Sequence, residues 1–387
     1  MRPIPDPRRR GSAPPEETNL SLNTPPFPVI FEPIFKAKPW GGRALASVCN
    51  KTLPGDEPIG ESWELVSLPG NESCVRSGPL AGRTVSELIE AWGRGLHGDT
   101  ALADGRFPLL IKFLDAREHL SVQVHPKPPD DDPSADVPGV KHEAWYVVHA
   151  EPGAELFIGL KPDVTPNDVA AAADTPRMKE LLRRWPVKAG QCYYLPSGTM
   201  HALGAGIVVA EIQTPSDVTY RLYDWDRVGR DGKPRELHIE QGLSNVRYNV
   251  RDELIQQPRR HVAGPFITLS HLIVCERFVI DKVRIVEGVS QELPHTDMVI
   301  WIVLKGSGTF RRDEVVCEFT RGDVVLIPAE SRGLRLEIAC DFETLEVKVP
   351  IRSRLADLPR PEPEPAPGLG PPDATRLTHH GKPIDPA

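Results

Sequence analysis

Short apolar segments separated by turn residues fill the central part of the 387-residue chain and limit the folds that it can adopt. These segments are apolar or alternate apolar with polar side chains, and Gly, Pro or Asp bounds them, as in ELFIGL (155–160) and DVVLIPA (323–329). Such segments predict β-strands, and many of them with frequent turns predict a sandwich or a jelly-roll barrel. We therefore expect a mainly β fold with a few helices.

Two helices carry clear start signals. In TVSELIEAWGRGL, Thr84 and Glu87 form a capping-box pattern ahead of an apolar face. In TPRMKELLRRW, Thr175 precedes a proline at the first turn, and apolar residues at helical spacing run as far as Trp185. A third short helix is expected within residues 234–246.

Proline-rich ends and one central break divide the chain. The 42 prolines are unevenly placed, and the two ends are rich in them and have no periodic apolar face, so residues 1–28 and 351–387 are predicted to be disordered tails. A polar, proline-marked segment near residues 256–265 separates two β-rich blocks. We expect a catalytic domain with helical insertions over residues 29–258 and a second domain over residues 262–350.

Composition argues against several classes of partner. The formal net charge is −8 and no basic stripe is visible, which argues against nucleic acid as a partner. No apolar run reaches the length of a membrane span. The six cysteines include no Cys-x-x-Cys pair, which is typical of reduced thiols and predicts a cytoplasmic protein. The sequence leaves open whether the chain is a monomer or a homodimer.

Four side chains in the first block are of types that bind divalent metals. Gln123 and His125 lie two residues apart in LSVQVHP, so a strand would direct both to one face. Glu143 precedes an apolar run that would bury it, and an unpaired buried carboxylate is costly. His201 follows the turn in PSGTMHAL. Taken alone, His125 and Gln123 are more often hydrogen-bonded core residues than ligands, and Glu143 could be a charge at a strand edge. One cation, however, would satisfy all four groups together.

The order of these residues resembles that of a known family. GQCYYLPSGTMH, which ends in His201, resembles the second cupin motif. Gln123, His125 and the later Glu143 resemble the first cupin motif in the form that type I phosphomannose isomerases carry. FKAKPWGG, GESWELV, TPSDVTYRLYDWDR and LHIEQ are also similar to that family, so the resemblance extends over about residues 29–350.

The resemblance implies a fold, an activity and a cofactor. It implies two cupin barrels and the interconversion of mannose 6-phosphate and fructose 6-phosphate through an enediol intermediate. It also implies one divalent metal per chain, with zinc as the expected ion, bound by Gln123, His125, Glu143 and His201. A phosphorylated hexose is then the expected substrate.

Further roles follow from the same resemblance. Arg221 would stabilise negative charge on the sugar oxygens, and Asp217, four residues earlier, is assigned to the same catalytic group. Lys141 matches a lysine that acts as acid and base. Ser121 and Lys112 match residues that bind the phosphate.

Two other functions use similar residues. An iron dioxygenase on a cupin fold also binds its metal with two histidines and a glutamate. A non-catalytic module that binds a sugar phosphate would keep the same pocket. The basic residues Lys141 and Arg221 favour the isomerase, because a dioxygenase has no evident need for them.

A weak internal repeat relates the two blocks. The Gly-x5-Pro pattern of residues 190–196 recurs at residues 322–328, and WIVLKGSG resembles YVVHAEPG. This alignment places a glycine at the position of His201 and Met298 at the position of Glu143. We therefore predict a degenerate second barrel that binds no metal.

Overall fold

The computed structural model describes residues 24–350, except for residues 131, 133–136, 138, 230, 231, 258, 294 and 295. Most of the two predicted tails, residues 1–23 and 351–387, lies outside the described residues. Residues 24–28, which composition assigns to the first tail, are part of the packed structure. The Pro26 carbonyl, for example, accepts a hydrogen bond from Arg312 at 2.7 Å.

The first half of the chain forms a unit of two main sheets. In spatial order, the six-stranded sheet contains β11 Cys192–Leu195, β8 Glu143–Ala150, β13 Ile207–Gln213, β6 Leu110–Ala116, β2 Ile34–Gly42 and β3 Ile59–Leu65. The five-stranded sheet contains β10 Leu182–Pro186, β9 Glu155–Leu160, β12 His201–Ala202, β7 Val122–Val124 and β14 Tyr220–Tyr223. A separate hairpin consists of β4 Ser67–Leu68 and β5 Asn71–Glu72.

The second half forms a similar unit of two sheets. Its seven-stranded sheet contains β1 Val29–Ile30, β22 Val324–Ile327, β19 Val299–Lys305, β24 Phe342–Lys348, β17 Val279–Ile285, β16 Ile267–Val274 and β15 Arg260–Ala263. Its four-stranded sheet contains β18 Ser290–Glu292, β23 Arg335–Ile338, β20 Ser307–Arg312 and β21 Val315–Thr320. The N-terminal strand β1 thus pairs with the second unit, although the sequence assigns it to the first.

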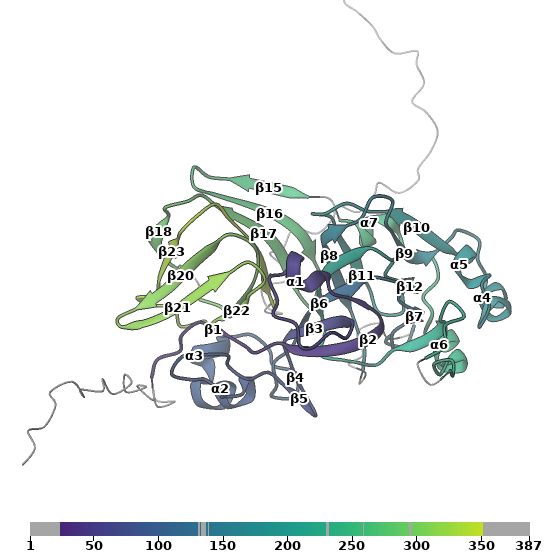
Figure 1. The fold of residues 1–387 in the computed structure, drawn as a ribbon, viewed down its shortest axis with the longest axis horizontal. Helices are drawn as coiled ribbons and strands as arrows, with labels where there is room; N and C mark the ends of the chain where they lie inside the picture. Colours follow the sequence, from purple (N-terminus) through teal and green to yellow (C-terminus); the bar gives the residue numbers. More distant parts are fainter. Residues whose placement is uncertain are drawn as a thin grey trace, which may run out of the picture.

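The four main sheets are stacked, with the two larger sheets in the middle (Figure 1). Side chains on β6 alternate between two cores: Ile111 and Phe113 pack toward the second unit, whereas Leu114 packs inside the first. Ile300 on β19 belongs to the same inter-unit core as Ile111. A mainly β fold is therefore confirmed. Each unit is an open sandwich, because no strand pairing among the described residues joins its two sheets.

Seven helices connect or cover the sheets in the described part of the chain. They are α1 Ala44–Val48, α2 Val85–Trp92, α3 Arg94–His97, α4 Pro166–Ala172, α5 Met178–Leu181, α6 Ile239–Asn245 and α7 Asp252–Ile255. The capping box of α2 is confirmed, because Thr84 accepts from the Glu87 amide and Glu87 accepts from the Thr84 amide. None of these helices has the length and apolar character that a membrane crossing requires.

The helix predicted to run as far as Trp185 is wrong beyond Leu181. Leu182 instead opens β10 and pairs with Leu160 on β9. Trp185 lies in this strand and donates its indole N–H to the Ile158 carbonyl at 3.0 Å. Strand pairing with β9 has overridden the helical spacing, which is a weak local preference.

Both units contain the same buried pair. In the first unit Trp145 on β8 donates its indole N–H to Glu211 on β13 at 2.8 Å. In the second unit Trp301 on β19 donates to Glu346 on β24 at 2.9 Å. The predicted repeat is therefore present in side-chain contacts as well as in strand order.

This pair corrects the alignment of the two blocks by one residue. Trp145 and Trp301 occupy equivalent positions, because Tyr193 and Val325, which pair with them, align when the two Gly-x5-Pro patterns align. The residue two positions before Trp301 is Val299, so Val299 and not Met298 is equivalent to Glu143. Both candidates are buried and apolar, so the loss of the carboxylate from the second unit is unaffected.

A buried ion pair ties the first unit to the second. Lys51 Nζ lies 2.6 Å from Glu64 Oε2 and donates to the Gly322 carbonyl at 2.8 Å. The Ser62 hydroxyl donates to the other oxygen of Glu64 at 2.5 Å. Because Lys51 and Glu64 are both buried, each depends on the other for its counter-charge.

Replacing Lys51 with Met should lower the free energy of unfolding by about 3 kcal/mol, because Glu64 would stay buried without a counter-charge. Urea unfolding followed by tryptophan fluorescence measures this change. The control is Arg83→Met, since the Arg83–Glu87 pair is exposed, with side-chain accessibilities of 51% and 42%, and should change stability by less than about 0.5 kcal/mol. Equal stability of the two variants would contradict the role given to Lys51.

Candidate metal centre

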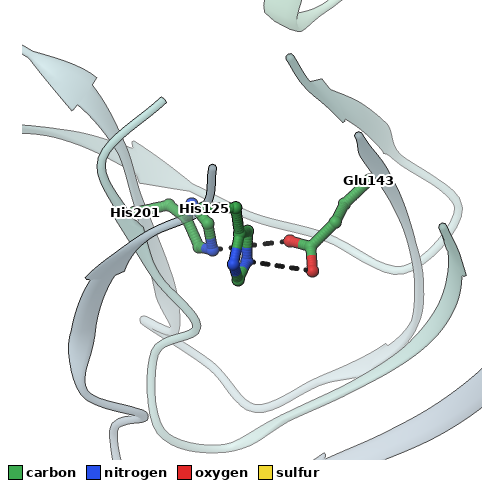
Figure 2. Close-up of side chains that lie close together, drawn as sticks. All are labelled: His125, Glu143 and His201. Atoms are coloured by element: carbon green, nitrogen blue, oxygen red, sulfur yellow. Dashed lines mark ion pairs between the residues drawn. The ribbon is translucent and has the colours of Figure 1, made fainter. Parts of the chain in front are cut away.

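Three buried side chains of metal-binding types converge inside the first unit (Figure 2). His125 follows β7, and His201 opens the neighbouring strand β12 of the same sheet, whereas Glu143 opens β8 in the other sheet. His125 Nε2 lies 3.1 Å from Glu143 Oε1, and His201 Nε2 lies 3.4 Å from Glu143 Oε2. The structure thus brings together three of the four side chains that the sequence singled out as metal-binding types.

The turn before His201 explains how that side chain is presented. The Thr199 amide donates to the Pro196 carbonyl at 3.0 Å, which closes the turn. Gly198 has a φ of 80°, and a Cβ at this position would lie 2.8 Å from the Asn245 carbonyl oxygen. Both constraints require glycine. The chain can then enter β12 with the imidazole directed into the interior.

Each imidazole has one nitrogen occupied by the backbone. His125 Nδ1 lies 2.9 Å from the Val218 carbonyl, and His201 Nδ1 lies 2.8 Å from the Thr199 carbonyl. A carbonyl only accepts, so each Nδ1 carries the proton and each Nε2 offers a lone pair. Burial, followed by the charge of Lys141, lowers the pKa of His125 to about 4, and burial lowers the pKa of His201 as well. Both rings are neutral at pH 7, as metal binding requires.

Glu143 is ionised, although burial acts against it. Burial raises the pKa of this carboxyl, but the positive charge of Lys141 acts against burial, and the pKa lies well below its usual range. Lys141 Nζ lies 2.7 Å from Glu143 Oε1, and both side chains are buried. The predicted neighbour relation of Lys141 and Glu143 is thus present, and it places an ammonium group beside the ligand cluster.

The cluster fits a divalent metal. Glu143 Oε2 and His125 Nε2 are buried and have no hydrogen-bond partner, although the Glu143 carboxylate lies 3.1 Å from His125 Nε2. The lone pair of a neutral imidazole and a carboxylate oxygen are both acceptors, so they repel each other at this distance. A cation between them removes the repulsion and satisfies both atoms.

Gln123 lies at the edge of the cluster. Its backbone pairs with that of His201, and its side-chain nitrogen lies 3.2 Å from His201 Nε2. The Ser121 hydroxyl lies 3.5 Å from Gln123 Oε1. A half-turn of the amide would exchange its nitrogen and oxygen and bring Oε1 to the cluster, since the two orientations differ little in shape. Gln123 is therefore placed to become a fourth ligand.

Lys112 lies on β6 in a row of buried charges. Its ammonium is 3.1 Å from Glu211 Oε1 and 4.0 Å from Glu61 Oε2, and it lies 5.2 Å from the centre of the Trp63 ring. Burial acts to lower the pKa of Lys112, but Glu211 and Glu61 outweigh burial and raise it. The predicted phosphate-binding lysine is thus already paired with two carboxylates.

Arg221 and Asp217 do not form one group. The backbone of Arg221 on β14 pairs with that of Gln123, and its guanidinium donates to the Glu236 carbonyl at 2.6 Å. Burial, followed by the charge of Arg235, lowers the pKa of Arg221. Asp217 is exposed. Arg221 therefore lies next to the cluster through Gln123, while Asp217 lies at the surface.

The sequence analysis did not single out Glu61 and Glu211. Both are buried, and Glu211 links Lys112 to Trp145, which packs edge-on against His201 with ring centres 5.3 Å apart. A signal was present, because Glu211 interrupts the otherwise apolar strand IVVAEIQ and buried carboxylates need partners.

Comparison with known proteins points in one direction. The family described as the catalytic domain of type I phosphomannose isomerase matches residues 29–162. The mannose-6-phosphate isomerase ManA of Bacillus subtilis is 35% identical over 316 residues, which span 80% of this chain and 96% of that protein. The mannose-6-phosphate isomerase of Streptococcus mutans is 40% identical over 220 residues, which span 56% of this chain and 66% of that protein.

Solved structures agree. The mannose 6-phosphate isomerase of Bacillus subtilis superposes with a TM-score of 0.72 at 32% identity, over 83% of this chain and 98% of that one. The apo mannose 6-phosphate isomerase of Salmonella typhimurium has a TM-score of 0.61 at 16% identity, over 83% of this chain and 98% of that one, and supports the fold alone. The chain therefore belongs to the type I phosphomannose isomerases and is an aldose–ketose isomerase.

Proposed function

We propose that the chain interconverts mannose 6-phosphate and fructose 6-phosphate with one bound zinc ion. The observation that carries this proposal is the convergence of two neutral imidazoles and an ionised carboxylate beside a buried lysine. The Bacillus subtilis relative named mannose-6-phosphate isomerase ManA, which aligns over 96% of its length, supports the choice of substrate.

His125, Glu143 and His201 would bind the metal, with Gln123 as the fourth ligand after its amide turns. Nitrogen and oxygen donors in this number suit zinc. When bound, the metal polarises the sugar oxygens and so acidifies the hydrogen on the neighbouring carbon.

Lys141 is our candidate for the group that moves the proton. In the forward direction a proton leaves C2 of mannose 6-phosphate and a proton returns to C1. The hydroxyl proton moves from O2 to O1 at the same time, so that the carbonyl shifts from C1 to C2. Lys141 Nζ lies in the buried region beside the ligands. Paired with Glu143 it is an ammonium, so it would have to release that proton before it could take the proton from C2 and return it to C1. Arg221 would stabilise the negative charge that develops on the sugar oxygens meanwhile.

Phosphate binding remains a prediction from family resemblance. We assign it to Ser121, whose hydroxyl is beside Gln123, and to Lys112. Because Lys112 is paired with Glu211 and Glu61, it would have to exchange one carboxylate partner for the phosphate. Asp217 is exposed, and a role in catalysis would require it to approach the sugar.

The cellular setting is also a proposal. None of the six cysteines is in a disulfide, in agreement with a reducing cytoplasm. We expect no nucleic-acid partner, and we expect a monomer or a homodimer. We also propose that the chain divides into a catalytic domain over residues 29–258 and a second domain over residues 262–350.

The direct test is isomerisation of mannose 6-phosphate, followed by coupled detection of fructose 6-phosphate. Zinc-loaded protein should turn over, chelation and dialysis should abolish turnover, and added zinc should restore it. Binding of the sugar phosphate without turnover would instead identify a non-catalytic module. Oxygen uptake without isomerisation would identify an iron dioxygenase.

Replacing Arg221 with Lys should lower kcat by roughly ten- to a thousand-fold, because an ammonium cannot reproduce the planar fork of a guanidinium. Metal content should be unchanged, since Arg221 is not a ligand. The matched control is Arg184→Lys, which changes an exposed arginine paired with Glu155 on β9 and should leave kcat unchanged. A normal kcat with only a raised KM in the Arg221 variant would reduce Arg221 to a substrate-binding residue.

A further inference from the structure

The segment that carries Lys141 and Glu143 has a second face, which no part of the proposed chemistry uses. Successive side chains of an extended segment point to opposite sides. Lys141 and Glu143 face the ligand cluster, so His142 between them faces the inter-unit core. It lies beside Tyr194, which belongs to that core and pairs through its backbone with Ala144.

His142 makes a specific contact on that face. Its Nδ1 lies 2.8 Å from the Tyr194 hydroxyl, and the Ser197 amide donates to the same nitrogen at 3.4 Å. A backbone N–H only donates, so Nδ1 carries no proton and accepts from Tyr194 as well. The two rings are nearly parallel, at an angle of 8°. The contact therefore fixes the ring of His142 in one tautomer and one orientation.

Tyr194 continues the contact into the second unit. Its ring packs edge-on against Phe278, with ring centres 6.0 Å apart. Cys275 and Phe278 hold each other in turn, because the Phe278 amide donates to Cys275 Sγ at 3.4 Å and the thiol donates to the Phe278 carbonyl at 3.2 Å. The path from His142 thus ends in the hydrogen-bonded turn between β16 and β17.

The backbone of the same segment is held separately. The His142 amide donates to the Thr214 hydroxyl at 3.1 Å, and the Thr214 hydroxyl donates to the Val140 carbonyl at 3.0 Å. The Thr214 amide donates to the His142 carbonyl at 3.1 Å. These bonds hold the backbone of the segment at Val140 and His142. The contact of His142 with Tyr194 adds a side-chain restraint on the face that points away from the ligand cluster, and Tyr194 in turn packs against Phe278 of the second unit.

We propose that His142 is a positioning residue for the isomerase reaction, through which the second unit fixes the placement of Lys141 and Glu143. This inference rests on the proposed function, because it assumes that Lys141 acts on the sugar. The second unit lacks a metal-ligand cluster among its described residues. The inference gives this unit a role in catalysis. A small displacement of a proton-transfer group is enough to slow a reaction.

The test compares variants that differ in one hydrogen bond. His142→Leu introduces an apolar side chain of similar size that has no hydrogen-bond acceptor. His142→Asn keeps an acceptor near the position of Nδ1. We expect His142→Leu to lower kcat about three- to tenfold with little change in KM, and His142→Asn to restore most of the loss. Tyr194→Phe, which removes only the hydroxyl, should reproduce the Leu variant. Combining His142→Leu with Tyr194→Phe should lower kcat no further than the single variants do, because both changes remove the same hydrogen bond.

A second readout separates positioning from packing. The visible spectrum of cobalt-loaded protein reports the geometry around Glu143, and it should change in His142→Leu and Tyr194→Phe but return in His142→Asn. His149→Leu is the matched control, since His149 lies on the same strand β8 with 43% of its side chain accessible. His149→Leu should have the same kcat and the same cobalt spectrum as the wild-type protein.

Two results would overturn the inference. The first is a wild-type kcat and cobalt spectrum in folded His142→Leu and Tyr194→Phe proteins. The second is an equal loss in His142→Leu and His142→Asn, which would show that only packing matters. If the unmodified protein does not isomerise mannose 6-phosphate, the proposed function fails, and the cobalt spectra still decide whether His142 positions Glu143.

Discussion

The burial of the Glu143 carboxylate is the constraint on which the rest of the first unit depends. An ionised group that is 1% exposed is too costly to keep without partners. Lys141 supplies one counter-charge at 2.7 Å, and two neutral imidazoles direct their free nitrogens toward the same carboxylate. The lysine compensates one oxygen, and the acceptor atoms that remain need a cation. Metal binding and the placement of the lysine are thus two consequences of one buried charge.

The two units share their strand arrangement and a buried Trp–Glu pair, but they differ at the position of Glu143. The Trp145–Glu211 and Trp301–Glu346 pairs lie at equivalent positions in the two long sheets. Two residues before the tryptophan, the first unit has a carboxylate and the second has Val299. The second unit also carries its own cation there, because Lys348 pairs through its backbone with Val299 and its ammonium lies 2.5 Å from Glu346. With Val299 in place of the carboxylate, the second unit lacks an equivalent of Glu143 that a metal could bind.

The sequence predicted what depends on local pattern and on residue type. The apolar segment ELFIGL yielded β9 with its observed bounds, and the donor types of His125, Glu143 and His201 led us to expect that one cation would join them. Prediction from the sequence failed where pairing between residues far apart in the chain determines the structure. The pairing of β10 with β9 ended the helix before Leu182. Only the three-dimensional pairing revealed that Lys112 is the partner of Glu211 and Glu61, because a carboxylate within a buried strand signals that it needs a partner but not which residue supplies it.

The central claim is that the first unit binds one metal tightly and the second unit binds none. Elemental analysis of the purified protein after extensive dialysis tests it most directly, with Glu143→Ala measured in parallel. We predict one zinc ion per chain in the unmodified protein and almost none in the variant, because the variant loses the only carboxylate in the cluster. Two tightly bound metals per chain, or one metal retained by Glu143→Ala, would contradict the account.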